Sequence, residues 1–277
     1  MTNMNIMTFD LEEWHLYDLY PKGGHSYFLP IIEGYLDRLL DLLDAKNYKA
    51  TFFCLGIIAQ EYPHIILKIA NRGHEIACHS YKHLHINKMT PETFRQDTRL
   101  AIDCLQELTG EKVDKYRAPS FSMRNTWQWA LEILAEEGIK YDSSIFSSGI
   151  NINQKEGKWD VPFQINLKGS ILYELPIGYH SIFGNRCIYS GGGFFRFFPY
   201  KAIKKWMNAA DYNMTYFHIR DFDKDQKRVV SSRYFLSYFG VNGAYKKFGE
   251  LIDDFGFLSV EQAVNRIEWE KGEIIYL

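Results

Sequence analysis

Strand-like and helix-like segments alternate over the first 142 residues, and this alternation restricts the folds open to the chain. Short apolar runs predict strands at 4–10, 49–54, 74–78, 113–117 and 139–142. Between them, apolar residues at helical spacing predict helices at 31–45, 57–72, 90–108 and 125–137. Such alternation indicates parallel β-α-β units. Because no G-x-G-x-x-G follows the first strand, we predict a (β/α) barrel rather than a dinucleotide-binding fold.

The alternation stops after residue 142. The stretch 171-ILYELPI-177 is extended in pattern, and 190-SGGGFFRFFPY-200 is rich in glycine and aromatic residues. We therefore predict a β-rich insertion around 150–200. A helix at 200–210, a strand at 214–218 and helices near 243–255 and 260–268 are expected to follow. With no internal repeat or linker in the pattern, residues 1–277 are predicted to form a single domain.

Composition excludes several classes of function. The formal net charge is −2 and the sequence pI is near 6.5, so no broad positive field attracts nucleic acid. No uncharged apolar run is long enough to span a membrane, and the first residues show no secretory signal pattern. We therefore expect a cytoplasmic protein without a membrane span. The four cysteines form no C-x-x-C pair, which favours buried free thiols.

Reactive side chains lie at or just beyond the ends of three of the predicted strands. Asp10 and Glu12 lie in 8-TFDLEEW-14, and His218 lies in 215-TYFHIRD-221. His79 and His83, in 76-IACHSYKHLHI-86, are four apart, so on a helical turn both rings could reach one ion. Taken singly, each group has a simpler explanation as a solvated acidic loop, a chance histidine pair or a structural histidine. In a barrel, however, the carboxyl ends of the strands meet, and two imidazoles with one carboxylate form an open metal site.

Five segments resemble, in chain order, the motifs of the polysaccharide (carbohydrate) deacetylases, the family with the nodulation-protein-B homology domain. They are TFDLEE (8–13), ATFFCLG (50–56), GHEIACHSYKH (73–83), YRAPSFS (116–122) and FHIRD (217–221). The His-Ser-x-x-His segment with its flanks is the most specific of these. Further segments resemble a sub-branch that acts in bacterial surface-polysaccharide synthesis, namely TFDLEEW (8–14), YDSSI (141–145), ELP (174–176) and GGGFFR (191–196).

The resemblance implies a distorted (β/α) barrel and a metal-dependent hydrolase. Its substrate would be an N-acetylated sugar of an O-antigen, capsule or exopolysaccharide, from which it removes an acetyl group. One divalent metal, usually Zn2+ with Mn2+, Co2+ or Ni2+ as alternatives, would activate a water. Residue by residue, the resemblance makes His79 and His83 metal ligands. It likewise makes Asp10 the general base, Arg117 the partner of Asp10, and His218 the general acid.

The chain also departs from the family pattern. Leu11 stands where the family commonly has its ligand aspartate, so we predict Glu12 as third ligand, with Glu13 as the alternative. The usual tryptophan of the fourth motif is not evident, which leaves Asp142, Glu174 or the Trp159-Asp160 pair to orient His218.

Substrate contacts are predicted at four residues: Trp14, Pro119, Ser120 and Gly192. A backbone N–H near Ser120 is expected to hold the oxyanion. Gly192 belongs to a glycine run that is a flexible lid, a backbone surface that approaches a sugar, or a plain loop.

Two other functions stay open from the sequence. The change to Leu11 is compatible with a catalytically inactive, sugar-binding member of the family. Related barrels also hydrolyse cyclic amides, so small ureides are an alternative substrate class. In each case the expected partner is a small molecule or carbohydrate, with no prediction for the oligomeric state.

Overall fold

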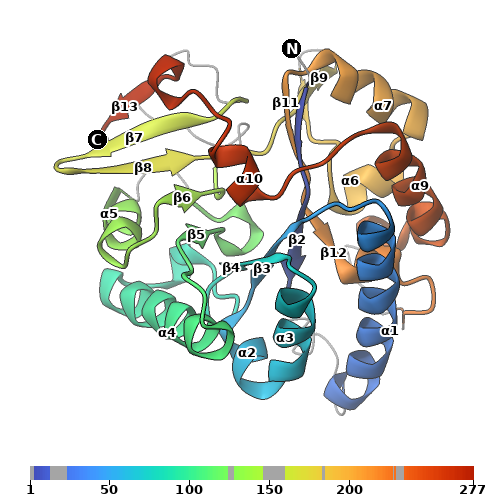
Figure 1. Cartoon of the computed structure of the whole chain (residues 1–277), viewed down its shortest axis with the longest axis horizontal. Helices are drawn as coiled ribbons and strands as arrows, with labels where there is room; N and C mark the ends of the chain where they lie inside the picture. Colours follow the sequence, from blue (N-terminus) through green and yellow to red (C-terminus); the bar gives the residue numbers. More distant parts are fainter. Residues whose placement is uncertain are drawn as a thin grey trace.

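A nine-stranded, mostly parallel sheet forms the centre of the molecule (Figure 1). The computed structural model describes residues 3–12, 24–123, 128–145, 160–182, 185–226, 228 and 234–277. In spatial order the strands are β12 (Phe217–His218), β2 (Thr8–Leu11), β3 (Thr51–Cys54), β4 (Glu75–Cys78), β5 (Lys115–Tyr116), β6 (Tyr141–Asp142), β8 (Ser170–Glu174), β7 (Phe163–Leu167) and β13 (Ile274–Tyr276). All neighbouring pairs are parallel except β7–β8.

The N-terminal segment pairs with the segment 212–218, first in a separate two-stranded sheet and then in the central sheet. β1 (Met4–Ile6) pairs in parallel with β11 (Tyr212–Met214), and β2 and β12 continue the same two segments. The five strands β2 to β6 are neighbours in chain order, as consecutive β-α-β units require. The predicted distorted (β/α) barrel is confirmed.

Helices cover the sheet from outside. Those between the first strands are α1 (Gly24–Ala45), α2 (Gly56–Glu61), α3 (Pro63–Asn71), α4 (Pro91–Thr109) and α5 (Gln128–Glu136). The later ones are α6 (Gly192–Phe197), α7 (Tyr200–Ala209), α8 (Tyr234–Tyr238), α9 (Val241–Asp254) and α10 (Val260–Val264). Local sequence explains their limits. Pro63 separates α2 from α3, while Thr90 caps α4 and Gly110 ends it in the left-handed conformation.

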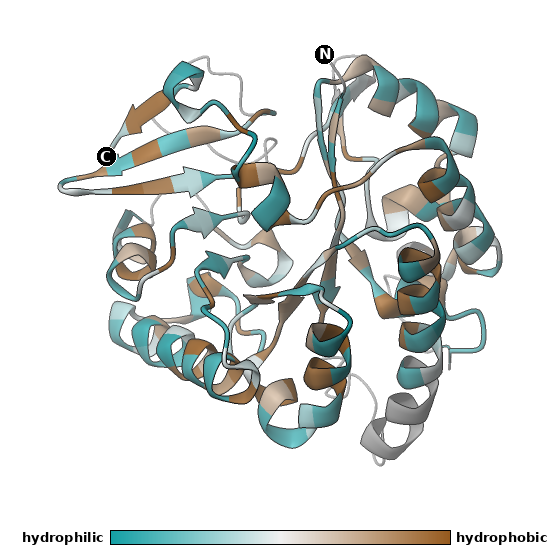
Figure 2. Ribbon diagram, in the orientation of Figure 1, coloured by the Kyte–Doolittle hydropathy of each residue, from teal (hydrophilic) through white to brown (hydrophobic). Residues whose placement is uncertain are grey.

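Aromatic rings pack among aliphatic side chains in the space between sheet and helices. Phe9 stacks on Phe52 with ring centroids 4.9 Å apart, and Phe217 packs against Phe9 and Phe248. All four rings are buried. Figure 2 shows the consequence along the helices, whose hydrophobic residues turn toward the sheet while hydrophilic residues face outward. The core therefore accounts for much of the aromatic content.

The region predicted as a β-rich insertion around 150–200 differs from that expectation in two ways. The β7–β8 hairpin belongs to the central sheet, since β8 pairs in parallel with β6. A small hairpin of β9 (His180–Ile182) and β10 (Asn185–Cys187) follows, but 192–197 is helix α6. The first part of the predicted insertion, 150–159, lies outside the described residues.

Glycine explains how the chain enters α6. Gly191 forms a parallel bridge with Tyr216, and a Cβ on Gly191 would lie 1.8 Å from the Tyr216 carbonyl oxygen. Gly192 then has φ +53°, in the region that glycine adopts without strain. Tertiary contact with Tyr216 thus decides the path of this segment. Across the described residues, no helix has both the length and the apolar character needed to cross a membrane.

Candidate metal centre

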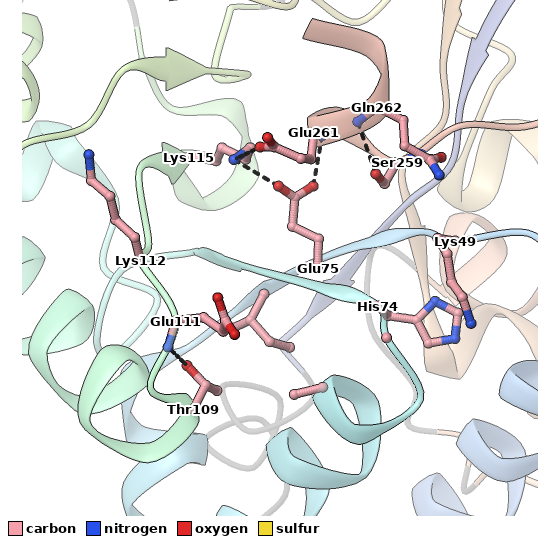
Figure 3. Close-up of a pocket in the computed structure, with 13 residues that line it drawn as sticks. Lys49, His74, Glu75, Thr109, Glu111, Lys112, Lys115, Ser259, Glu261 and Gln262 are labelled. Carbon is pink, nitrogen blue, oxygen red and sulfur yellow. Dashed lines mark hydrogen bonds and ion pairs between the residues drawn. The ribbon is translucent and has the colours of Figure 1, made fainter. Parts of the chain in front are cut away.

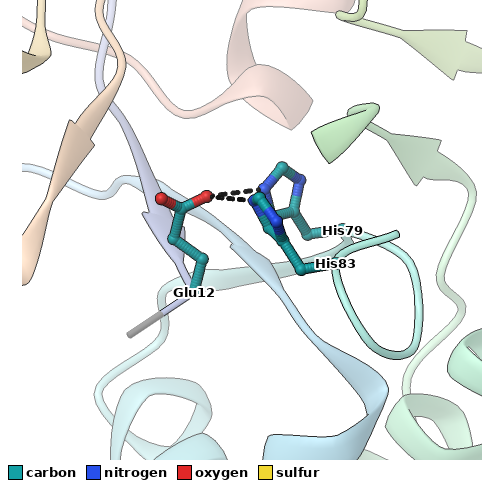
Figure 4. Close-up of side chains that lie close together, drawn as sticks. All are labelled: Glu12, His79 and His83. Carbon is teal, nitrogen blue, oxygen red and sulfur yellow. Dashed lines mark hydrogen bonds and ion pairs between the residues drawn. The ribbon is translucent and has the colours of Figure 1, made fainter. Parts of the chain in front are cut away.

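Glu12, His79 and His83 converge at the carboxyl ends of the central strands (Figure 4). Glu12 Oε2 lies 2.7 Å from His83 Nε2 and 3.2 Å from His79 Nε2. One potential ligand atom from each residue falls within 4.8 Å of the others. The convergence follows from the sheet register, because β2, β3 and β4 end side by side at Leu11, Cys54 and Cys78.

Strand alternation explains why Glu12, and not residue 11, faces the centre. Successive side chains of a strand point to opposite faces, so Asp10 and Glu12 share one side of β2. Leu11 is 1% exposed and belongs to the hydrophobic core. The family's usual ligand position is therefore occupied by a core residue, and Glu12 supplies the carboxylate of the cluster. Glu13 lies outside the described residues.

The two histidines are brought together by a tight loop, which corrects the helical turn expected from their spacing. Ser80 and His83 both have positive φ, +70° and +58°, which no α-helix contains. The Ser80 hydroxyl accepts the His83 backbone N–H at 3.0 Å and stabilises the turn. The spacing correctly predicted that the His79 and His83 rings converge. The backbone that brings them together is a tight loop and not a helical turn.

The donor set fits a divalent cation. His79 Nδ1 lies 2.8 Å from the Arg117 carbonyl oxygen, so it donates there and Nε2 keeps its lone pair toward Glu12. Burial raises the pKa of Glu12, but His218, His83 and His79 outweigh it and hold the pKa well below the usual value. Two imidazole nitrogens with one ionised carboxylate are ligands that suit Zn2+ and related first-row ions.

Asp10 lies beside this cluster, paired with a buried arginine. Arg117 Nη1 is 2.6 Å from Asp10 Oδ1, and the two side chains are 0% and 4% exposed. Arg117 also donates to Thr8 Oγ1 and to both oxygens of Ser143. Its guanidinium stacks over the Phe53 ring, 4.0 Å from the centroid. These contacts fix the orientation of the Arg117 guanidinium, which in turn holds the Asp10 carboxylate in place.

His218 approaches the cluster from β12. Its Nε2 lies 3.2 Å from Glu12 Oε1, while its Nδ1 lies 3.0 Å from Asp221 Oδ2. Burial lowers the pKa of His218, but the Glu12 and Asp221 carboxylates outweigh it and raise the pKa to about 10. For Asp221, burial raises the pKa, and His218 with Arg196 lowers it to about 2. The Asp221 carboxylate therefore remains charged and stabilises a protonated ring.

The residue that orients His218 was missed from the sequence. Asp142 and Glu174, the proposed candidates, bond instead to Ser144 and to the Ile145 backbone. Asp160 is half-buried, and Trp159 lies outside the described residues. Asp221 closes the FHIRD segment, and its i,i+3 position in the 3-10 turn η4 (Ile219–Phe222) was an available signal.

Arg196 was the second residue without a predicted role. It lies in the GGGFFR segment, and its Nε is 3.3 Å from Asp221 Oδ1. Its Nη1 also donates to the Ser237 carbonyl at 2.7 Å. Both side chains of the Arg196–Asp221 pair are 4% exposed. The segment that marked the sub-branch resemblance thus supports the carboxylate behind His218.

Three of the four predicted substrate residues, Pro119, Ser120 and Gly192, lie around the same end of the sheet. Pro119 is buried and Ser120 is exposed in the turn η3 (Pro119–Phe121), which follows Arg117 and gives Ser120 φ +53°. Gly192 is buried against the Tyr216 ring. Trp14 lies outside the described residues. Packing against Tyr216 accounts for the glycine at 192, and the substrate-binding roles of the four stay predictions.

The cavity in Figure 3 is at the other end of the strands. Its volume is about 530 Å³, and Glu75 and Lys115, which begin β4 and β5, line it. The Lys115 ammonium is neutralised there by Glu75, Asp114 and Glu261, at 2.7–2.8 Å. In barrels of this kind the amino-terminal end serves stability, whereas chemistry occurs at the carboxyl end. The cavity is therefore separate from the metal centre.

Comparisons with known proteins agree with this geometry. Residues 16–141 match the family described as polysaccharide deacetylase, and residues 143–265 match a domain of unknown function, DUF3473. A peptidoglycan-N-acetylglucosamine deacetylase of Bacillus cereus is 35% identical over 97 residues, which cover 34% of this chain and 35% of the relative. A Bacillus subtilis protein provisionally named polysaccharide deacetylase YheN is 29% identical over 136 residues, 48% of each chain. The chain thus spans less than half the length of these relatives.

A solved structure supports the fold across the whole chain. A Mycobacterium smegmatis protein provisionally named a polysaccharide deacetylase superposes with a TM-score of 0.70 at 23% identity, covering 99% of this chain and 93% of that one. The motifs, the converging strand ends and the matches over both halves point to one conclusion. Residues 16–141 carry a match to the polysaccharide deacetylase family, and the fold of the whole chain agrees with it.

Proposed function

We propose that the protein is a metal-dependent hydrolase that removes the acetyl group from an N-acetylated sugar. One observation carries the proposal: the Glu12-His79-His83 cluster has beside it an aspartate held by an arginine and a histidine held by an aspartate. Hydrolysis of an amide needs a polarised carbonyl, a base for water and an acid for the leaving nitrogen. The three parts of the site supply these functions at one end of the sheet.

Glu12, His79 and His83 would hold the cation, which when bound polarises the acetyl carbonyl and makes water more acidic. Asp10 takes the proton from the water that adds to the carbonyl carbon. The Arg117 guanidinium holds the Asp10 carboxylate in position. His218 gives a proton to the sugar nitrogen as the C–N bond breaks, which yields acetate and a free amine. Asp221 stabilises the protonated ring beforehand.

The finer assignments are also proposals. The nitrogen and oxygen donor set favours Zn2+, with Mn2+, Co2+ or Ni2+ as alternatives. Segments 141–145, 174–176 and 191–196 support a substrate from a bacterial surface polysaccharide, because they resemble the sub-branch that acts there. The names of the relatives, one of which is a peptidoglycan-N-acetylglucosamine deacetylase, support an acetylated amino sugar as the substrate class.

Acetate release from a panel of substrates tests the proposal. The panel contains N-acetylated amino-sugar oligomers, O-acetylated xylan and cyclic ureides, each incubated with zinc-loaded protein. We expect acetate from the N-acetylated sugars, loss of that activity in His79→Ala, and no change in His64→Ala, whose side chain on α3 is 56% exposed. Turnover of ureides alone, or tight sugar binding with no acetate released under any of the four metals, would contradict the proposal.

A further inference from the structure

Two carboxyl groups that the mechanism does not use face each other inside the molecule. Asp142 ends β6 and Glu174 ends β8, and the two residues are direct partners in the parallel pairing of these strands. Both residues are 0% exposed. A buried pair of carboxylates is costly unless a cation, a set of donors or a proton compensates it.

Hydrogen-bond donors satisfy only part of the pair: the Asp142 carboxyl also accepts from the Ser143 and Ser144 backbone N–H groups, yet one oxygen of each carboxyl is left over. Asp142 Oδ1 accepts the Ser144 hydroxyl at 2.5 Å, and Glu174 Oε1 accepts the Ile145 backbone N–H at 2.9 Å. Among the described residues, the second oxygens, Asp142 Oδ2 and Glu174 Oε2, are buried without a hydrogen-bond partner. Two ionised groups cannot bond each other, since both offer only acceptors. One proton between them turns one carboxyl into a donor and satisfies both remaining oxygens.

Electrostatics supports the same arrangement. Burial and the neighbouring Asp142 raise the pKa of Glu174 well above its usual value, whereas burial raises the pKa of Asp142 only to about 6. Glu174 is thus the member that keeps the proton.

We propose that Asp142 and Glu174 share one proton, carried by Glu174 at neutral pH, and that this pair positions the arginine that holds the catalytic aspartate. The positioning role rests on the function proposed above. Proton sharing does not, because it follows from the burial and bonding of the two groups alone.

Two serines connect the Asp142–Glu174 pair to Arg117. The Ser144 hydroxyl donates a hydrogen bond to Asp142 and accepts one from the Ala118 backbone N–H at 2.7 Å. Ala118 is the residue directly after Arg117. The Ser143 hydroxyl donates to the Leu175 carbonyl at 2.8 Å and accepts from Arg117 Nη2 at 3.0 Å. The residues that flank the carboxyl pair therefore fix both the backbone and the side chain of the arginine.

The proton shared by Asp142 and Glu174 also lowers the negative charge near Arg117. The groups facing the pair are the Arg117 guanidinium and the phenols of Tyr116 on β5 and Tyr212 on β11. Burial raises the pKa of both phenols well above the usual value, so they stay neutral and Arg117 is the cation available. A doubly ionised pair would compete with Asp10 for that cation. The shared proton leaves Arg117 to Asp10.

Infrared difference spectroscopy of the intact protein tests the proton directly. At neutral pH we expect the carbonyl band of a protonated carboxylic acid, its loss in Glu174→Gln, and its persistence in Glu137→Gln. Glu137 is the matched control because its side chain is 6% exposed but ion-paired to Arg95 and Arg99, which keep it ionised. A wild-type spectrum without the band, or a band unchanged in Glu174→Gln, would overturn proton sharing whether or not the protein deacetylates sugars.

Steady-state kinetics tests whether the carboxyl pair positions Arg117. The amide of Glu174→Gln can donate to Asp142 as the protonated acid does, so this variant should keep its kcat and extend activity to higher pH. Glu174→Leu offers no hydrogen-bonding atom and leaves Asp142 without its donor, and we expect kcat to fall about tenfold or more with KM little changed. Equal kcat in Glu174→Leu and wild type, both shown folded by denaturant unfolding, would overturn the positioning role.

Discussion

At the scale of single residues, the site depends on side chains whose partners fix their orientation. Arg117 is fully buried and bonds Thr8, Asp10 and Ser143 at once. His79, His83 and His218 could be found from the sequence because each lies at or just beyond the end of an apolar strand. Arg196 could not, because its contact with Asp221 joins segments that only the folded chain brings together. The same holds for the proton shared by Asp142 and Glu174, which depends on strand pairing.

Substitution of Asp10 tests its assignment as the general base. Asp10→Asn keeps an oxygen for Arg117 but cannot take a proton from water, so we expect kcat to fall about 10²- to 10⁴-fold. Metal content, measured by elemental analysis, should not change, because Asp10 is not one of the three ligands. Asp253→Asn, at a 62% exposed side chain on α9, is the control and should keep wild-type kcat. Full activity in Asp10→Asn would assign the base elsewhere.

At the scale of elements, local patterns predicted the strands and helices up to residue 142, together with the break at Pro63 and the capped helix α4. Prediction failed at α6, because its sequence opens with glycines, which disfavour helices, and continues with phenylalanines, which favour strands. The bridge of Gly191 to Tyr216 decides this segment, and no local signal reveals a bridge to a residue 25 positions away in the sequence.

The Gly191–Tyr216 contact gives a test of that explanation. Gly191→Ala would place a Cβ 1.8 Å from the Tyr216 carbonyl oxygen, so the strand that carries His218 must move. We expect a stability loss of about 1–3 kcal/mol by denaturant unfolding, with reduced kcat. Gly249→Ala, in α9 with no atom within 4 Å of the added Cβ, should be neutral or stabilising. Equal stability of Gly191→Ala and wild type would remove the proposed reason for this glycine.

A buried histidine at the start of β4 gives a pH-dependent test. His74 is 4% exposed, and its Nδ1 accepts the Ala50 backbone N–H that precedes β3. Burial, with Lys49 nearby, lowers the pKa of His74 to about 4. The unfolded chain therefore takes up this proton first, and the stability contributed by neutral His74 is present above about pH 6.5 and lost as pH falls toward 4.

His74→Asn keeps an acceptor but removes the titration. We expect the wild type to lose up to about 3 kcal/mol more than this variant between pH 6.5 and 4. Urea unfolding at several pH values measures the difference, and parallel stability curves for the two proteins would contradict it.

At the scale of the whole molecule, two sequence regions combine to make one site. Glu12, His79 and His83 come from the first half of the chain, whereas His218 and Asp221 come from the region that matches DUF3473. Pairing of β2 with β12 and of β6 with β8 joins these halves in one sheet. The organisation of residues 1–277 as a single domain stays a prediction that this pairing favours.

The most direct test of the account is acetate release from an N-acetylated amino-sugar oligomer before chelation, after chelation and after return of Zn2+ to the same protein. If Glu12, His79 and His83 hold the ion that the reaction needs, release should stop on chelation and return with about one zinc per chain. Undiminished acetate release by the metal-free protein would contradict the central claim.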